Sequence, residues 1–135
     1  MRHWMVALFL VIAIALGALG QISLRKGMAE NEKSYGSLGT PGIGMISKVV
    51  RAVFTPYVLL GLALYAVSSG FWLVVISPGG WALSYAYPMI AIGYVLVVLL
   101  SRAFFHEKVM PLQWLGILVM CTGLVLVAHF GEPRG

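Results

Sequence analysis

Ser101-Arg102-Ala103-Phe104-Phe105-His106-Glu107-Lys108-Val109-Met110-Pro111 is a short charged segment between two apolar runs, residues 81–100 and 112–130. Each run approaches the roughly 20 residues that an α-helix needs to cross the hydrocarbon of a bilayer. Pro111 suits the first turn of a helix, where the N–H that proline lacks would have no intrahelical partner. The pattern predicts two membrane-spanning helices joined by a compact polar turn.

The composition is typical of an integral membrane protein. Of the 135 residues, 61% are hydrophobic and 10% are charged, and such a chain cannot cover its apolar surface as a soluble globule. Cys121 is the one cysteine, which excludes an intramolecular disulfide. The net charge of +5 comes from basic residues beside the apolar runs. That placement favours anionic lipid headgroups, and not nucleic acid, as partners.

Two further apolar runs complete an all-α membrane protein of four helices. We expect a single domain over residues 1–135, with spans at about 4–24, 57–76, 81–100 and 112–130. A cleavable signal peptide is the alternative for the first run, because Arg2 precedes it and residues 15–20 are small. The length of that run and the basic pair Arg25-Lys26 after it favour a retained span.

The distribution of basic residues predicts the orientation. The connections after the first and third spans carry seven of them: Arg25, Lys26, Lys33, Lys48, Arg51, Arg102 and Lys108. The opposite side carries two, Arg2 and Arg134. Because cytoplasmic loops are enriched in Lys and Arg, we expect both termini outside the cytoplasm.

The connection from 27 to 56 is the least hydrophobic part of the chain. Residues 30–44 are rich in turn formers and charges and predict a surface loop. Thr55-Pro56 fits the N-cap and first turn of the second span. Before it, apolar residues recur at helical spacing, and they are Ile43, Ile46, Val50, Val53 and Phe54. This spacing predicts a short interfacial helix. The alternative is that these residues extend the second span toward its N-terminus.

Acidic residues are absent from the four expected spans. The chain has no Asp, and its four Glu residues fall in connections or at the C-terminal end: Glu30, Glu32, Glu107 and Glu132. Exchange of protons for cationic drugs usually needs a carboxylate inside the membrane, so that activity is disfavoured. His129 lies at the outer end of its span, where we expect it to have a structural role at the membrane interface. The sequence holds no nucleophile–base pair, metal-ligand cluster or phosphate-binding glycine loop, so we expect no enzymatic activity, cofactor or metal.

Gln21 is the most polar side chain of the first span. An amide in hydrocarbon needs a partner, either on a neighbouring helix or in a wet cavity. The expected spans also carry hydroxyl groups. A lone serine in a span usually bonds the backbone of its own helix. Together with Gln21, however, these hydroxyl groups could line a neutral cavity that suits a sugar or polyol. They belong to Ser23, Ser68, Ser69, Ser84, Tyr65, Tyr85, Tyr87, Tyr94 and Thr122.

Four basic residues lie at the expected cytoplasmic boundary: Arg25, Lys26, Arg102 and Lys108. Two interpretations remain open. The side chains either anchor the topology at the headgroups or capture a phosphate, for which the arginine fork is well suited. His106-Glu107 is expected to pair with Lys108 and to shape the turn.

Small residues on the spans indicate close helix contacts, as in Ala13-x-x-x-Gly17 and the pair Gly116 and Gly123. The run Gly116-Ile-Leu-Val-Met-Cys-Thr-Gly-Leu-Val resembles the glycine-spaced fourth helix of the small multidrug-resistance transporters. Leu83-Ser-Tyr-Ala and Leu100-Ser-Arg-Ala-Phe-Phe resemble parts of their third helix. The chain thus resembles the four-span branch of the drug/metabolite transporter superfamily. Two positions depart from the drug exporters, with Gly17 in place of their essential glutamate and Pro88 in place of a substrate-contacting tryptophan.

A second group within this EamA-like branch is more similar. The shared residues are Gly20-Gln21 with a following basic residue, Ala86-Tyr87-Pro88-Met89, His106-Glu107, Val109 and Trp114. These residues resemble the subunits that flip 4-amino-4-deoxy-L-arabinose-phosphoundecaprenol during lipid A modification. The resemblance implies a protein of the bacterial inner membrane that works as a homodimer, or as a heterodimer with a paralogous four-span subunit. Its implied substrate is a polyprenyl-phosphate-linked sugar.

Nine residues are therefore candidates for substrate binding. Arg25, Lys26 and Arg102 would attract the phosphodiester, with His106 and Glu107 beside them. Gln21, Tyr85 and Tyr87 would hydrogen-bond the sugar, and Pro88 would leave a carbonyl free or kink the helix. Two alternatives stay open: export of a small metabolite or drug, and a non-transporting subunit that assembles another membrane complex.

Overall fold

The computed structural model describes residues 2–35 and 44–134. Within them the helices are α1 (His3–Tyr35), α2 (Met45–Val53), α3 (Pro56–Val75), α4 (Leu83–Met89), α5 (Ala91–Phe105) and α6 (Pro111–Phe130). Four stretches are long and apolar enough to cross a membrane: His3–Ser34, Pro56–Val75, Leu83–Phe105 and Pro111–Phe130. The expected fold class is confirmed, because the chain is an all-α, multi-pass protein with a short helix between its first two spans.

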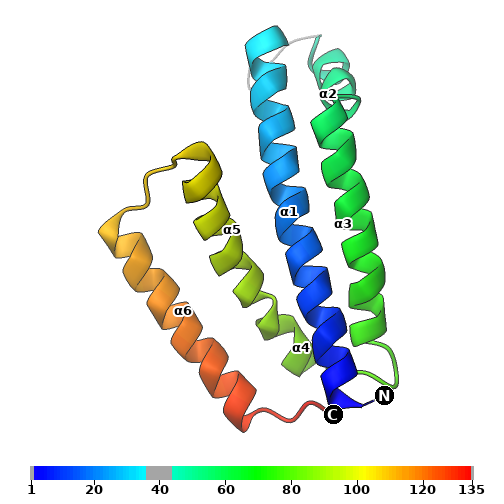
Figure 1. The fold of residues 1–135 in the computed structure, drawn as a ribbon, viewed down its shortest axis with the longest axis vertical. Coiled ribbons are helices and arrows are strands. Elements are labelled where there is room, and N and C mark those ends of the chain that lie inside the picture. The colour runs from blue at the N-terminus through cyan, green and yellow to red at the C-terminus, as the bar shows by residue number, and fades with distance from the viewer. Residues whose placement is uncertain (1, 36–43, 135) are drawn as a thin grey trace.

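Helices α1 and α3 form a close antiparallel pair (Figure 1). The backbones nearly touch where Gly20 meets Gly61, since a Cβ built on Gly61 would lie 2.8 Å from the Gly20 carbonyl oxygen. Ser68 of α3 donates a hydrogen bond from Oγ to the carbonyl oxygen of Ala13, with 2.7 Å between the oxygens. Small residues that admit the partner backbone, and hydroxyls that bond across the contact, are the usual means of packing helices in a membrane.

Helix α1 is longer than the expected span. Its 33 residues are about 50 Å long at 1.5 Å per residue, well beyond the roughly 30 Å of bilayer hydrocarbon. Residues 30–35, expected to belong to a surface loop, are instead part of α1, because the helix continues to Tyr35. Asn31, only 4% exposed, stabilises this extension by donating from Nδ2 to Thr55 Oγ1 at 3.3 Å. Residues 36–43, which include Ile43 of the expected interfacial helix, lie outside the described residues.

Helix α2 is a separate element and not an extension of α3. The chain leaves helical geometry at Thr55, which has φ −64° and ψ 134°, because the following Pro56 disfavours the helical region for the residue before it. Thr55 occupies the N-cap position, but its hydroxyl donates to the carbonyl oxygen of Arg51 and does not cap α3. Apolar side chains on α2 remain exposed, with Ile46 at 79%.

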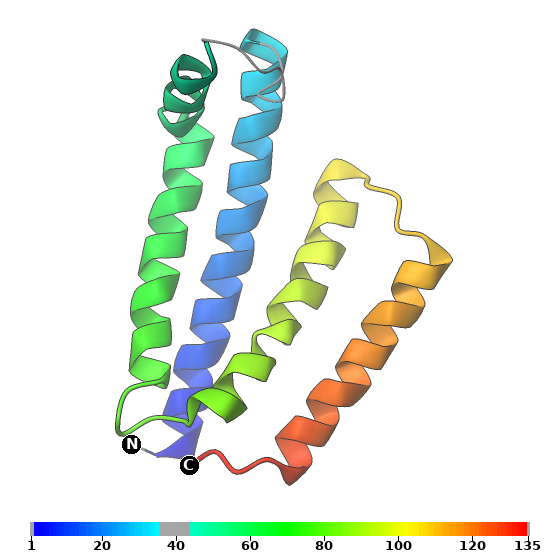
Figure 2. The same cartoon turned by 180° about the vertical axis from the view of Figure 1, so that it is seen from behind.

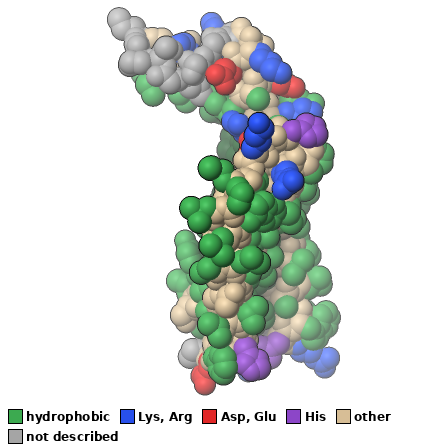
Figure 3. Space-filling view, turned by 90° about the vertical axis from the view of Figure 1, so that its left-hand side faces the viewer, with side chains coloured by type: hydrophobic (Ala, Val, Ile, Leu, Met, Phe, Trp, Pro, Cys, Tyr) green, Lys and Arg blue, Asp and Glu red, His purple; other side chains and the backbone are tan. Residues whose placement is uncertain are grey.

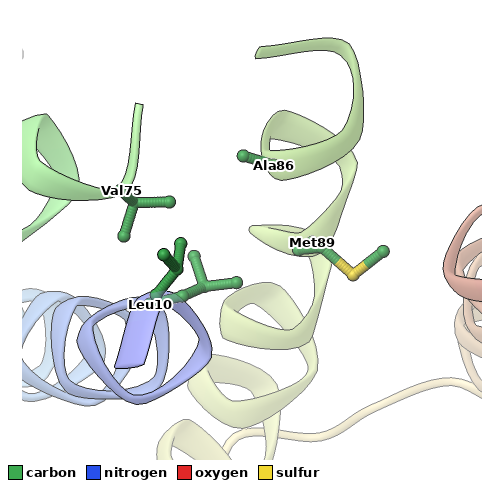
Figure 4. Packing of buried hydrophobic residues seen from close by; sticks show 5 residues of the cluster. Leu10, Val75, Ala86 and Met89 are labelled. Carbon is green, nitrogen blue, oxygen red and sulfur yellow. The ribbon is translucent and has the colours of Figure 1, made fainter. Parts of the chain in front are cut away.

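The third span is broken after Pro88. Proline has no N–H to bond the carbonyl four residues before it, and α4 ends at Met89 while α5 begins at Ala91. Figure 2 shows the change of direction, which lays α4 across the lower end of α1. There the buried residues of α1, α3 and α4 form the core cluster, part of which Figure 4 shows; its members are Val6, Leu10, Val75, Ala86 and Met89.

Helix α6 is the least buried of the four candidate spans. It contacts α4 and α5 and lies on the side away from α3 (Figures 1 and 2). None of its residues is buried. A Cβ built on Gly116 or Gly123 would meet nothing within 4 Å. The small-residue face of α6 is therefore open in the single chain.

Candidate phosphate site at the charged end

Charged side chains gather at one end of the bundle, where α5 connects to α6 (Figure 3). We call this the charged end; it carries Arg25 and Lys26 of α1, Arg102 of α5, and the connecting residues His106, Glu107 and Lys108. The N- and C-terminal residues lie at the opposite, terminal end (Figure 1). Between the two ends the visible surface is largely hydrophobic (Figure 3), so the charged side chains on this face lie where the spans end.

Arg25 and Glu107 form an ion pair across 82 residues of sequence. One carboxylate oxygen, Oε1, lies 3.2 Å from Nη2 and accepts a hydrogen bond from Nε at 3.3 Å. The expected pairing of Glu107 with Lys108 is wrong. Glu107 turns instead toward α1, where Arg25 donates a hydrogen bond from Nε to this oxygen and brings Nη2 within ion-pair distance of it.

The neighbouring cations rest on aromatic rings. The Lys26 ammonium lies 4.4 Å from the centre of the Tyr57 ring, and the Arg102 guanidinium lies 5.7 Å from the Trp114 ring. Such contacts stabilise a cation by about 0.5–1 kcal/mol at exposed sites. A guanidinium over a ring keeps N–H groups at its edge, so Arg102 is held in place and can still donate to an anion.

A hollow of about 460 Å³ opens at the charged end, lined by Arg102, His106, Glu107, Lys108 and Val109. Its ionised side chains are two cations and one carboxylate, and the carboxylate is already paired with Arg25. The surplus of positive charge suits an anion such as a phosphate. A second hollow, of about 550 Å³, lies at the terminal end around residues 77–80 and Arg134, and none of the nine candidate residues lines it.

His106 shapes the hollow through its backbone. Its φ of 52° and ψ of 33° place it in the left-handed region directly after α5, where glycine usually ends a helix. Left-handed geometry costs a residue with a Cβ about 1–2 kcal/mol. This turn at His106 redirects the chain out of α5 so that Glu107 can reach α1.

Gln21 lies on the side of α1 that meets α5. Ile14 is on this face, because its side chain is 3.3 Å from a Cβ built on Gly93 of α5. At 3.6 residues per turn, Gln21 and Arg25 each lie within about 20° of Ile14 around the helix. The Gln21 side chain is exposed, and no residue of the described chain forms a hydrogen bond with its amide.

The remaining candidates lie far from the cations, at the terminal end. The Tyr85 hydroxyl donates to the carbonyl oxygen of Ala128 at 3.5 Å. Tyr87 is 62% exposed and meets the Trp72 ring edge-on. Pro88 follows directly, in the last turn of α4. The structure therefore gathers Arg25, Arg102, His106 and Glu107, but it does not bring the tyrosines and the cations into one site.

Several of the hydroxyls expected to line a polar cavity are engaged within the bundle. Ser23 and Ser68 donate to carbonyl oxygens of the facing helix. Ser69 and Thr122 donate to carbonyls four residues earlier in their own helices. These four groups are held by backbone carbonyls and do not converge on a common cavity.

The sequence interpretation missed Asn31 and the partner of Glu107. Asn31 continues the α1 face of Gly20 and Gly27 at helical spacing, and that spacing is the signal that would have extended the helix beyond residue 24. The Arg25–Glu107 pair leaves no comparable signal, because the two residues meet only through the packing of distant segments.

Three relatives share the name probable 4-amino-4-deoxy-L-arabinose-phosphoundecaprenol flippase subunit ArnE. The protein from Hamiltonella defensa subsp. Acyrthosiphon pisum (strain 5AT) is 29% identical over 131 residues, which cover 96% of this chain and 98% of that protein. The protein from Pseudomonas fluorescens (strain Pf0-1) is 37% identical over 52% of this chain and 61% of its own length. The protein from Aeromonas salmonicida (strain A449) is 36% identical over 57% of this chain and 66% of its own.

The chain is homologous to the ArnE flippase subunits over nearly its full length. The resemblance inferred from the residues is thereby confirmed. No family model matches the chain, and no solved structure matches it.

Gly17 lies in the contact between α1 and α3. The drug exporters that the chain resembles carry a glutamate at this position. Here Gly17 faces α3, and a Cβ built on it would lie 3.2 Å from Ser68 Oγ. A longer acidic side chain would have to displace the Ser68 hydroxyl from its bond to Ala13. The α1–α3 contact thus fills the space that a carboxylate side chain at this position would need.

Proposed function

We propose that this protein is a flippase subunit that moves a polyprenyl-phosphate-linked sugar, such as aminoarabinose-phosphoundecaprenol, across a bacterial inner membrane. One observation carries the proposal: a cation-rich hollow lies at one end of an otherwise apolar four-span bundle, in a chain homologous to flippase subunits. The named relatives are transport subunits and not enzymes, which supports transport without catalysis.

The first step is capture of the lipid phosphate at the charged end. Positive residues at span ends favour the cytoplasmic side of a membrane, so the charged end faces the cytoplasm and both termini lie outside. Arg102 and Lys108 border the hollow, with Arg25 and Lys26 one helix away. A phosphodiester at the leaflet boundary accepts charge-assisted hydrogen bonds from these donors, and arginine meets it through two parallel N–H groups.

The second step is passage of the sugar along the α1 face that meets α5. Gln21 lies one helical turn from Arg25 toward the middle of the bundle, and its exposed amide can donate to and accept from sugar hydroxyls. The prenyl chain stays in lipid, beside the exposed apolar surface of α6. Tyr87 and the helix break at Pro88 then receive the headgroup at the terminal end, where Tyr85 borders the same turn.

A second subunit completes the pathway. Within residues 2–35 and 44–134, the tyrosines and the cations among the nine candidates lie at opposite ends of the bundle, and α6 presents an open face with Gly116 and Gly123. Close approach of another helix at such small residues stabilises membrane dimers by packing. The partner is a second copy or a paralogous four-span subunit.

Native mass spectrometry tests the proposed substrate. The protein is released in mild detergent from membranes of the cell that makes it, without added lipid. A retained adduct with the mass of a polyprenyl phosphate bearing a sugar supports the proposal and gives the headgroup, and the same spectrum gives subunit number and any paralogous partner. Ordinary phospholipids alone, in repeated preparations, would contradict it.

A further inference from the structure

Glu107 is the acidic member of the five residues that line the hollow at the charged end. Its carboxylate lies on Arg25, a cation that the proposed function assigns to the lipid phosphate. An internal anion therefore occupies one of the positions at which an external anion is expected.

We propose that Glu107 is an internal competitor for the phosphate of the lipid ligand. In the unliganded chain the carboxylate occupies the N–H edge of Arg25, and a phosphate-bearing lipid binds there by displacing it. The inference rests on the proposed function and adds to it the step in which the Glu107 carboxylate leaves Arg25.

The geometry of the ion pair supports displacement. Glu107 uses one oxygen, Oε1, for both Nε and Nη2 of Arg25, and these N–H groups form the edge of the guanidinium that also meets phosphate oxygens. The two side chains are 62% and 42% exposed, so an incoming oxygen can reach the pair. Exposed pairs of this kind are weak because water and salt screen them.

The surroundings favour a phosphate over the carboxylate once the lipid arrives. Arg102 and Lys108 line the same hollow as Glu107. A phosphate that replaces Oε1 on Arg25 has additional oxygens that can turn toward these cations, whereas Oε1 of Glu107 serves Arg25 alone among the described residues. Each additional charge-assisted hydrogen bond adds to the advantage of the ligand.

Displacement also releases a tie between two parts of the bundle. Arg25 belongs to the α1–α3 pair, whereas Glu107 belongs to the connection between α5 and α6. Breaking their contact frees this connection from α1 at the charged end, on the face that carries Gln21. Ligand binding would thereby open the entrance to the proposed passage.

The test measures binding of undecaprenyl phosphate to the full-length protein in detergent. Glu107→Gln keeps the size of the side chain and removes the competing charge, so it should bind about two- to fivefold more tightly than the wild type, the range expected from an exposed ion pair. Glu132→Gln, at the terminal end, makes the same change in net charge and should bind like the wild type.

The Arg25→Gln background separates displacement from a general charge effect. Glu107→Gln should give no gain there, because the carboxylate no longer blocks a cation. A gain of equal size in that background, or no gain in the wild-type background, would overturn the inference while leaving lipid binding intact. Absence of undecaprenyl phosphate binding in every variant would overturn the proposed function and the inference together.

A second probe distinguishes a lipid from a soluble anion. Inorganic phosphate, added at the same concentration as undecaprenyl phosphate, should not displace the lipid from the Glu107→Gln variant. Displacement would identify a soluble phosphate as the ligand and overturn the assignment to lipid.

Discussion

The backbone of Gly61 on α3 lies so close to Gly20 on α1 that a Cβ on Gly61 would be 2.8 Å from the Gly20 carbonyl oxygen and 2.9 Å from the Leu24 backbone nitrogen. These neighbours are backbone atoms, which cannot turn aside as a side chain can. The contact sets the separation of α1 and α3. It therefore fixes the position of the α1 face that carries Gln21 and Arg25.

Gly61→Ala should destabilise the bundle. Overpacking a tight contact costs typically about 1–3 kcal/mol, more than the roughly 0.5–1 kcal/mol that alanine gains over glycine inside a helix. Gly70→Ala, on the same helix with nothing within 4 Å, is the matched control and should be neutral or mildly stabilising. Reversible unfolding in mixed detergent measures both changes, and equal stabilities would contradict the close contact.

Ser68→Ala should weaken the α1–α3 pair through a lost interhelical hydrogen bond. Ser68 donates to Ala13 on the facing helix, and such bonds contribute about 0.6 kcal/mol on average in membrane proteins. Its neighbour Ser69 bonds its own helix at Tyr65, so Ser69→Ala should cost less. The same unfolding measurement compares the two variants, and a larger loss at Ser69 would argue against the observed bonding.

His106→Gly should stabilise the fold by about 1 kcal/mol, because glycine enters the left-handed region without the Cβ clash. His106→Val should destabilise it, since a β-branched residue is strongly disfavoured at positive φ. Thermal unfolding of the three proteins orders them as Gly, His and Val from most to least stable. Valine at least as stable as glycine would contradict the left-handed turn after α5.

The sequence was sufficient for the architecture and not for the site. Apolar runs near 20 residues located the four spans, because hydrocarbon thickness imposes that length on any helix that crosses it. The extension of α1 to Tyr35 was missed because charges and turn formers conceal its helical face, which continues through Gly27 to the buried Asn31. The break in the third span could be expected from Pro88, because proline lacks the N–H that would bond the carbonyl four residues earlier in the same helix.

Contacts between distant segments could not be predicted in the same way. Glu107 was expected to pair with its neighbour Lys108, whereas it pairs with Arg25 on α1. Tyr85 and Tyr87 were grouped with the cations by their chemistry, but their position on α4 places them at the terminal end. Residue type indicates what a side chain can do, and helix packing decides which side chains meet.

Gly123→Leu should disrupt the proposed subunit contact and leave the single chain intact. The position has nothing within 4 Å in the chain itself, so the larger side chain meets no atoms of its own fold. Gly70→Leu on α3 is the control, because that position is equally open and lies off the proposed interface. Cross-linking in the membrane, before and after each substitution, measures the dimer with a second copy or a paralogue. An unchanged dimer in Gly123→Leu would exclude this face of α6.

Arg102→Ala should lower lipid transport by about tenfold or more, because a charge-assisted hydrogen bond contributes about 1.5–3 kcal/mol. Gln21→Ala should lower transport less, by about fivefold, as expected for one neutral hydrogen bond near 1 kcal/mol. Arg2→Ala, at the terminal end, should retain wild-type transport. Full transport by both Arg102→Ala and Gln21→Ala, at normal expression, would contradict the site.

Translocation itself is measured most directly in liposomes that contain the protein, together with its partner subunit if one co-purifies. A polyprenyl-phosphate-linked sugar with a fluorescent group on the sugar is placed in both leaflets, and an impermeant reductant then bleaches the outer leaflet. We predict that the protected inner-leaflet signal decays faster with the protein than in protein-free liposomes, and that Arg102→Ala slows this decay. An inner-leaflet signal that stays protected equally well with and without the protein would contradict lipid translocation.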